Sequence, residues 1–151
     1  INRRMDIKGK IKLDNKTCIL IDDYGHHPTE IRNTYKSIQE SFPDSHIYMV
    51  FQPHRFTRTK DLFDDFVDVL SDVGKVFLLD IYSAGEEKIE GISSQVLLDA
   101  LNENSSNNLL TEKKDLALTL TREVEDNSII LMQGAGNISE LTDILLSEYK
   151  V

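Results

Sequence analysis

The chain has 151 residues, of which 40% are hydrophobic, and this is the usual size of one globular domain with a substantial core. Its formal net charge of -9 and its pI near 4.8 argue against a nucleic-acid surface, because phosphate binding needs a basic field. No apolar run approaches the roughly 20 residues of a bilayer span, and the first ten residues lack the apolar core of a signal peptide. We therefore expect a cytoplasmic protein that binds neither nucleic acid nor membrane.

Short apolar runs alternate with amphipathic segments along the whole chain. The runs predict buried strands over residues 17–21, 47–51, 76–79 and 128–132, with a weaker strand at 108–110. Apolar residues at helical spacing predict helices over residues 28–42, 62–70, 96–101, 116–124 and 138–149. Pro28 takes the first position of the first helix, and Pro43 ends it.

Strands that alternate with helices of this length imply right-handed crossovers between parallel strands. The predicted fold is therefore a three-layer, doubly wound α/β domain with a mainly parallel sheet. In such sheets ligands bind outside the carboxyl ends of the strands, so the loops that follow the strands should carry the chemistry. Residues 52–59 and 80–92 are expected to be two of these loops.

Four segments that follow predicted strands are rich in functional groups: DDYGHHP at 22–28, QPHRFTRT at 52–59, YSAGE at 82–86 and QGAGN at 133–137. The first two contain three of the four histidines. Arg55, Arg58 and Lys60 form a local basic cluster in an acidic chain. Because the carboxyl ends of parallel strands share one rim, we expect the four segments to converge on one site.

The adjacent residues His26 and His27 allow two interpretations. Imidazole and the neighbouring carboxylates are ordinary ligands for zinc or iron, which fits a metal-dependent hydrolase. Adjacent histidines rarely both face one ion, however, and no second cluster in the sequence has ligand spacing. We therefore expect His26 to face the rim, His27 to pack at the helix terminus ahead of Pro28, and no metal site.

For Arg55 and Arg58 the residues alone leave two interpretations open. In the first they belong to a solvated basic turn, with Arg58 paired to Asp61 or Asp65. In the second, two guanidinium groups at a loop-to-helix junction grip a carboxylate or a phosphate. The glycine turn 134–136 lacks the third glycine of a dinucleotide fingerprint and is expected to be structural, whereas the roles of Tyr82 and Glu86 stay open.

Two of these segments, extended to DDYGHHPTEI at 22–31 and FQPHRFTRT at 51–59, closely resemble motifs of the Mur ligase family. Within that family they are similar to the ligases that add L-alanine to UDP-N-acetylmuramate. Arg3-Arg4, YSAGE and the glycine turn stand in the same order, so the resemblance covers essentially the whole chain. The sibling ligase that recycles muramyl tripeptide shares the His-His-Pro loop but lacks PHRFTRT.

The resemblance implies that this chain is the Rossmann-like C-terminal domain of a three-domain enzyme. Residues 1–12 would be the junction to the missing N-terminal and central domains, and residues 13–151 the domain itself. In the implied reaction ATP phosphorylates the muramic acid carboxylate, the amine of L-alanine attacks the acyl phosphate, and ADP and phosphate leave. ATP and Mg2+ would be held mainly by the central domain, so this chain alone is expected to be inactive.

The resemblance also assigns roles to single residues. Asp23 matches an aspartate that contacts the ATP ribose, and Arg4 matches an arginine directed at the ATP phosphates. The residues that match positions around the incoming L-alanine are Tyr24, His26, Arg55 and Arg58. The two arginines suit its carboxylate, which favours the clamp over the solvated turn. Arg4, Asp23 and His26 are the expected catalytic group.

Two positions depart from the family pattern. Met5 stands where an aromatic residue is usual, and Asn137 where an aspartate is common, so both departures concern nucleotide contacts. Three functions compete from the sequence. The first is the ligase domain, acting on L-alanine or on a different amino acid or peptide. The second is a stand-alone α/β module that binds a small anion, and the third is the metal-dependent hydrolase.

Overall fold

Six strands form one sheet in the computed structural model, which describes residues 4–103 and 105–151. The strand order is β1-β2-β6-β3-β4-β5. β1 runs antiparallel to β2, and every other neighbouring pair is parallel. The strands are β1 (Asp6–Leu13), β2 (Lys16–Asp23), β3 (Ile47–Phe51), β4 (Lys75–Leu78), β5 (Leu109–Leu110) and β6 (Ser128–Gln133).

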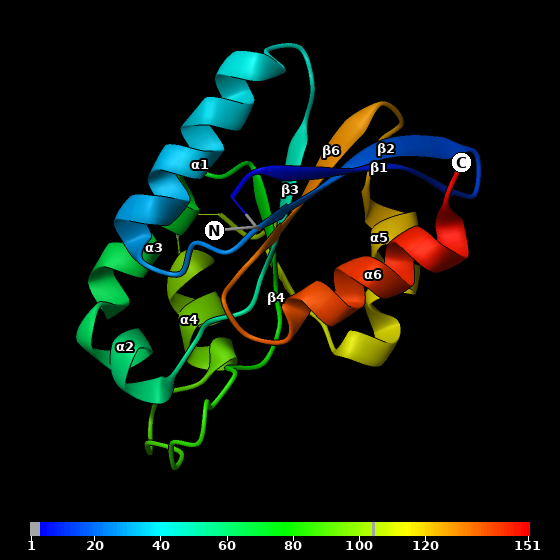
Figure 1. Ribbon diagram of the computed structural model, residues 1–151. Helices are drawn as coiled ribbons and strands as arrows, with labels where there is room; N and C mark the ends of the chain where they lie inside the picture. The colour runs from blue at the N-terminus through cyan, green and yellow to red at the C-terminus, as the bar shows by residue number, and fades with distance from the viewer. Residues whose placement is uncertain (1–3, 104) are drawn as a thin grey trace.

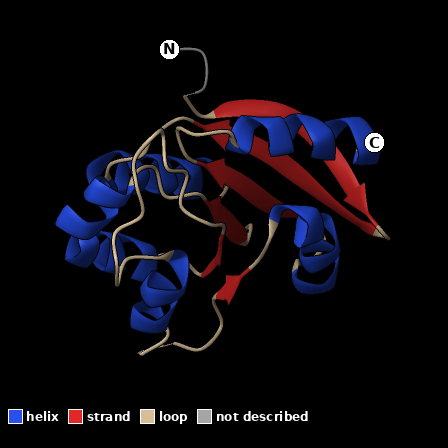
Figure 2. Ribbon diagram, turned by 90° about the horizontal axis from the view of Figure 1, so that it is seen from below, coloured by secondary structure: helices blue, strands red, loops and turns tan. Residues whose placement is uncertain are grey.

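Helices cover both faces of this sheet, as Figure 1 shows. One layer contains α1 (Pro28–Ser41), α2 (Phe56–Asp61), α3 (Phe63–Ser71) and α4 (Ser94–Leu101). The other contains α5 (Leu116–Glu123), which follows the short 3-10 helix η1 (Lys113–Asp115), and α6 (Ile138–Tyr149). In Figure 2 the sheet lies between the two layers. The three-layer, doubly wound, mainly parallel fold that the sequence predicts is confirmed.

The central strands β3 and β6 are buried along their whole length. Successive side chains of a strand point to opposite faces, so each strand supplies both helical layers. Met49 and Leu131 belong to the core beneath α1, α3 and α4, whereas Val50 and Met132 belong to the core beneath α5 and α6. Burial on both faces explains why these strands read as continuous apolar runs rather than alternating ones.

β1 is an element that the apolar pattern does not predict. Ile11 and Leu13 are fully buried, but the register with β2 shifts between Ile7 and Gly9, and Ile7 is 58% exposed. Gly9 has a φ of +140° at this bulge, which breaks the regular alternation of a half-buried strand. Residues 6–12 of the expected junction therefore form most of an edge strand of the sheet, and Arg3 lies outside the described residues.

Helix α2 is a second element that differs from the prediction, because the sequence predicts a loop over residues 52–59. Phe56 and Thr59 are its only buried residues, so a helix this short has no apolar periodicity to detect. Val96, placed on the apolar stripe of α4, is 38% exposed. Among the described residues, no helix is long and apolar enough to cross a membrane.

The adjacent strands β2 and β6 send the chain to opposite faces of the sheet. α1 follows β2 into one layer, and α6 follows β6 into the other (Figure 1). A divergence of this kind opens a crevice above the carboxyl ends of the strands, and ligands of doubly wound sheets bind there. Asp23 and Gln133, the last residues of β2 and β6, are paired at the base of this crevice.

Candidate active site

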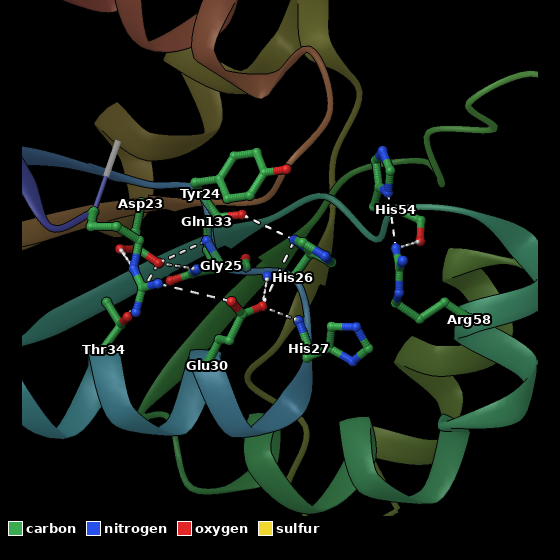
Figure 3. Close-up of polar contacts among 11 residues, drawn as sticks. Asp23, Tyr24, Gly25, His26, His27, Glu30, Thr34, His54, Arg58 and Gln133 are labelled. Atoms are coloured by element: carbon green, nitrogen blue, oxygen red, sulfur yellow. Dashed lines mark hydrogen bonds and ion pairs between the residues drawn. The ribbon is translucent and has the colours of Figure 1, made fainter. Parts of the chain in front are cut away.

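Asp23 ends β2 with a side chain that is fully buried. Its Oδ1 accepts a hydrogen bond of 2.8 Å from the backbone N–H of Met5. Its Oδ2 accepts three more, from the backbone of Gly25 (2.9 Å), the hydroxyl of Thr34 (3.1 Å) and the amide of Gln133 (2.7 Å), as Figure 3 shows. One carboxylate thus joins the segment before β1, the loop after β2, helix α1 and strand β6.

Arg4 lies beside this carboxylate but is held loosely. Its Nε is 3.8 Å from Asp23 Oδ1 and its Nη1 is 3.9 Å from Glu30 Oε2, while 47% of its side chain is exposed. Both separations exceed hydrogen-bond length, so these are ion pairs of low strength at a partly solvated position. The structure therefore brings together the two residues that the resemblance assigns to ATP.

Glu30 organises the loop that carries the histidine pair. Its Oε1 accepts the backbone N–H groups of His26 and His27, each at 3.1 Å, which is the reverse half of a capping box at the start of α1. Burial opposes ionisation of this group, but these two donors hold the pKa of Glu30 below its ordinary value. The spacing of Glu30 from the start of α1 is the signal that could have identified this role.

Four rings form a row across the rim, in the order Tyr24, His26, His54, Tyr82. Their centroids are separated by 5.3, 5.7 and 5.5 Å, and the rings of His54 and Tyr82 are nearly parallel at 13°. Desolvation, together with the charge of Arg58, lowers the pKa of His26. His26 faces this row as expected, and His27 is the exposed N-cap residue of α1, with its ring centroid 5.0 Å from that of His26.

Arg58 is anchored by His54 rather than by an acidic residue. Its Nη1 lies 2.9 Å from His54 Nδ1 and donates to the His54 carbonyl oxygen at 3.0 Å (Figure 3). In the part of the chain that the structure describes, Arg58 forms no ion pair with Asp61 or Asp65, so the salt bridge of the solvated-turn interpretation is not formed. The guanidinium lies on the rim beside His54, the third ring of the row.

Arg55 is exposed at the N-terminus of α2, with a φ of +76°. Such a backbone conformation is strained for a residue with a Cβ and persists where the surroundings hold it. Here the N–H of Arg55 donates to Tyr82 O at 2.8 Å, and Tyr82 N–H donates to Pro53 O at 2.8 Å. The loops after β3 and β4 are therefore joined by backbone hydrogen bonds, which place Tyr82 on the rim.

Glu86 caps the helix that carries Arg58. Its carboxylate accepts the hydroxyl of Thr57 at 2.5 Å and the backbone N–H of Thr57 at 3.1 Å. These hydrogen bonds lower the pKa of Glu86. A carboxylate at the first turn of a helix satisfies N–H groups that lack partners within the helix. Glu86 thus fixes the orientation of α2 and has a structural role at the edge of the site.

The glycine turn after β6 is filled by protein atoms. Gln52 Oε1 accepts the N–H of Ile138 at 3.2 Å, and Gln52 Nε2 donates to Asn137 Oδ1 at 2.7 Å. A Cβ at Gly136 would lie 2.7 Å from Cγ of Tyr82. The N-terminus of α6 is thus occupied by Gln52, and the turn is structural, as the sequence pattern predicts.

The expected site residues gather on one rim of the sheet. The structure also gives roles on that rim to Glu30, Gln52, His54 and Gln133, which lie in the motif segments without an expected role, and to Thr34, which lies outside them. A neighbouring cleft of about 650 Å3 is lined by Gln52, Tyr82 and Ser83, with Lys113 and Lys114 on its other side. Within residues 4–103 and 105–151, no three histidine, cysteine or acidic side chains are grouped so that they could hold a metal ion.

Comparison with known sequences identifies relatives along nearly the whole chain. The sequence profile of the family described as Mur ligase, glutamate ligase domain, matches residues 3–136. A UDP-N-acetylmuramate--L-alanine ligase from Psychrobacter arcticus is 40% identical over 142 residues, covering 93% of this chain and 30% of that protein. The ligase of the same name from Baumannia cicadellinicola is 45% identical over 145 residues, covering 91% and 30%. The chain therefore spans about 30% of the length of these curated relatives.

Solved structures show the same fold. The crystal structure of the UDP-N-acetylmuramate-alanine ligase from Thermotoga maritima aligns with a TM-score of 0.73 at 26% identity, over 97% of this chain and 30% of that one. A folylpolyglutamate synthase/dihydrofolate synthase from Yersinia pestis, complexed with AMPPNP and a manganese ion, aligns with a TM-score of 0.57 over 97% and 31%. At 10% identity the second likeness concerns the fold alone.

Proposed function

The chain belongs to the Mur ligase family, and from that membership we propose that it is the C-terminal domain of an ATP-dependent ligase that joins L-alanine to UDP-N-acetylmuramate. The observation that carries the proposal is the pair Arg55 and Arg58 beside the row of rings, at the carboxyl ends of the strands. Two cations there suit the carboxylate of an amino acid whose amine must reach an acyl phosphate. The 40% and 45% identities to ligases of this name support the choice of L-alanine.

The contribution of this chain to the reaction is positioning. ATP transfers its terminal phosphoryl group to the muramic acid carboxylate, and the amine of L-alanine then attacks the acyl carbon and expels phosphate. Arg55 and Arg58 hold the α-carboxylate of L-alanine, so the encounter of amine and acyl phosphate becomes a reaction between fixed groups. His26 and Tyr24 bound the same space, and Glu30 fixes the loop that carries both.

The nucleotide side of the proposal involves Asp23 and Arg4. Oδ2 of Asp23 already accepts three hydrogen bonds, so a ribose hydroxyl approaches at Oδ1, where Arg4 and Met5 lie. When Arg4 turns from Oδ1 to the ATP phosphates, it leaves room for that hydroxyl. Mg2+, when bound, neutralises phosphoryl charge, and we place its ligands in the central domain. We place the enzyme in the bacterial cytoplasm with its UDP-sugar substrate.

The test rejoins this chain to the N-terminal and central domains, either its own or those of the Psychrobacter arcticus relative. ADP release should require both UDP-N-acetylmuramate and L-alanine. Release supported by another amino acid or by a muramyl peptide would instead assign the sibling activity. Binding of small anions without any ADP release would favour the stand-alone module.

The 151-residue chain supplies the control for this test. Because it lacks a phosphate loop and a second phosphate-binding lobe, it should fold yet release no phosphate above background with ATP, magnesium and L-alanine. Robust turnover by this chain alone would overturn the proposal that it is one domain of a larger ligase.

A further inference from the structure

Arg58 uses one nitrogen for both of its described contacts. Its Nη1 lies 2.9 Å from the Nδ1 of His54 and 3.0 Å from the His54 carbonyl oxygen. A terminal guanidinium nitrogen carries two N–H groups, and arginine has no acceptor, so Nη1 donates both of its hydrogens to His54. The Nε–Nη2 edge keeps three N–H groups, and that edge matches a carboxylate in two parallel hydrogen bonds.

The same contact fixes the tautomer of His54. Because Arg58 can only donate, Nδ1 must accept, and the imidazole proton must lie on Nε2. Burial, followed by the charge of Arg58, lowers the pKa of His54, which keeps the acceptor lone pair available at neutral pH. The other groups that face this ring are His26, Arg55 and Glu86.

The ring of His54 is itself held on two sides. It stacks on Tyr82 at 13° with a centroid distance of 5.5 Å, and its backbone forms an isolated parallel bridge to Tyr82. The ring of His26 lies 5.7 Å away on the other flank. A side chain fixed by stacking, by a backbone bridge and by a neighbouring ring can orient a flexible guanidinium that otherwise samples many rotamers.

We propose that His54 is a positioning residue that turns the Nε–Nη2 edge of Arg58 toward the carboxylate of the amino-acid substrate. The substrate class rests on the function proposed above, whereas the orientation of Arg58 rests on the two contacts of Nη1. His54 acts through Arg58 and holds one face of the clamp in place before the amino acid arrives.

Two substitutions distinguish the contribution of the His54 ring from that of its acceptor atom Nδ1. His54→Phe keeps a ring for stacking on Tyr82 but removes Nδ1, whereas His54→Asn loses the ring and keeps an acceptor near the position of Nδ1. In the rejoined ligase, His54→Phe should lower kcat/KM for L-alanine by about tenfold or more, because a hydrogen bond to a charged group is lost. His54→Asn should recover part of this loss, and the KM for ATP should stay the same in both.

A double-mutant cycle and an NMR measurement decide the assignment. In an Arg58→Ala background, His54→Phe should have little further effect, because its partner is already absent. Additive losses, or an Asn variant no better than Phe, would show that His54 serves packing alone. Histidine 15N shifts of the 151-residue chain should show the proton of His54 on Nε2, and protonation at Nδ1 would refute the contact whatever reaction the rejoined enzyme performs.

Discussion

Asp23 and the arginine pair lie on the same rim but differ in how much of their hydrogen-bonding capacity the protein itself uses. Asp23 is fully buried, and four donors of this chain occupy its two oxygens. Arg55 is exposed, and both described contacts of Arg58 leave from one of its three nitrogens. Three of the four hydrogen bonds of Asp23 lie on Oδ2 and hold the architecture together, which leaves acceptor capacity on Oδ1, whereas Arg58 keeps the three N–H groups of its Nε–Nη2 edge for a ligand.

The largest expected effect comes from removing the buried carboxylate of Asp23. Asp23→Ala removes the acceptor of four donors and should lower the free energy of unfolding by about 3–5 kcal/mol, the range for one partner lost from a buried charged network. Urea denaturation of the 151-residue chain measures this loss. Asp68→Ala, an exposed position on α3, is the matched control and should change stability by no more than about 0.5 kcal/mol. A loss as small for Asp23→Ala would mean that its hydrogen bonds contribute little.

The second effect concerns activity rather than folding. Arg58→Ala and Arg55→Ala in the rejoined enzyme should each lower kcat/KM for L-alanine by about ten- to a hundredfold, since a charge-assisted bond contributes about 1.5–3 kcal/mol. Arg→Lys should recover only part of the activity, because the planar fork is lost. Steady-state kinetics with L-alanine and ATP varied separately provide the measurement. Equal losses for both substrates would contradict the clamp.

A third substitution tests the packing of the glycine turn after β6 against Tyr82 and Gln52. Gly136→Ala places a methyl group 2.6 Å from Gln52 Oε1 and 2.7 Å from Tyr82 Cγ, so the Tyr82 ring must move. We expect a loss of about 1–3 kcal/mol, as in other overpacked sites, measured by chemical denaturation. Gly74→Ala is the control, because no atom lies within 4 Å of its added carbon. If both variants were equally stable, the close approach of Gly136 to Tyr82 would not constrain the site.

The smallest effect is a pH dependence of stability that arises from His26 and His54. Both have a pKa below the ordinary 6.5 when folded, so the unfolded chain binds more protons as the pH falls below about 6.5. Stability should therefore decrease from about pH 6.5 downward and level off once the folded pKa values are passed. Thermal unfolding between pH 7.5 and 5 measures this slope. His26→Asn and His54→Asn should each flatten it, and an unchanged slope in both would place its origin elsewhere.

The sequence predicts most of the fold because buried strands and helices show characteristic spacings of apolar residues. Residues 47–51 read as a strand since every side chain there is buried, and Pro28 and Pro43 mark the ends of α1 by their backbone restrictions. β1 escapes prediction because a bulge at Gly9 interrupts its alternation, and α2 because a helix held by Glu86 and Tyr82 needs no apolar stripe.

The roles of the site residues are harder to predict from sequence, because each role depends on hydrogen-bond partners that lie far away in the chain. Motifs predict that Arg58 lies on the rim, but only the fold shows that His54 takes up its Nη1. Nothing in the string DDYGHHP distinguishes a solvent-facing aspartate from a buried one that accepts hydrogen bonds from Thr34 and Gln133. The exposure of His27 likewise depends on how Glu30 turns the loop.

The two edges of the sheet bear on how the protein behaves at high concentration. An unpaired strand edge invites a strand of another copy, and charge, bulges and short length discourage that pairing. β1 presents Lys10 and Lys12 outward beside the bulge at Gly9, and the chain terminus adds a single bridge between Ile11 and Lys150. β5 at the opposite edge is only two residues long. Neither edge offers a long flat template, so strand-mediated aggregation is disfavoured at both.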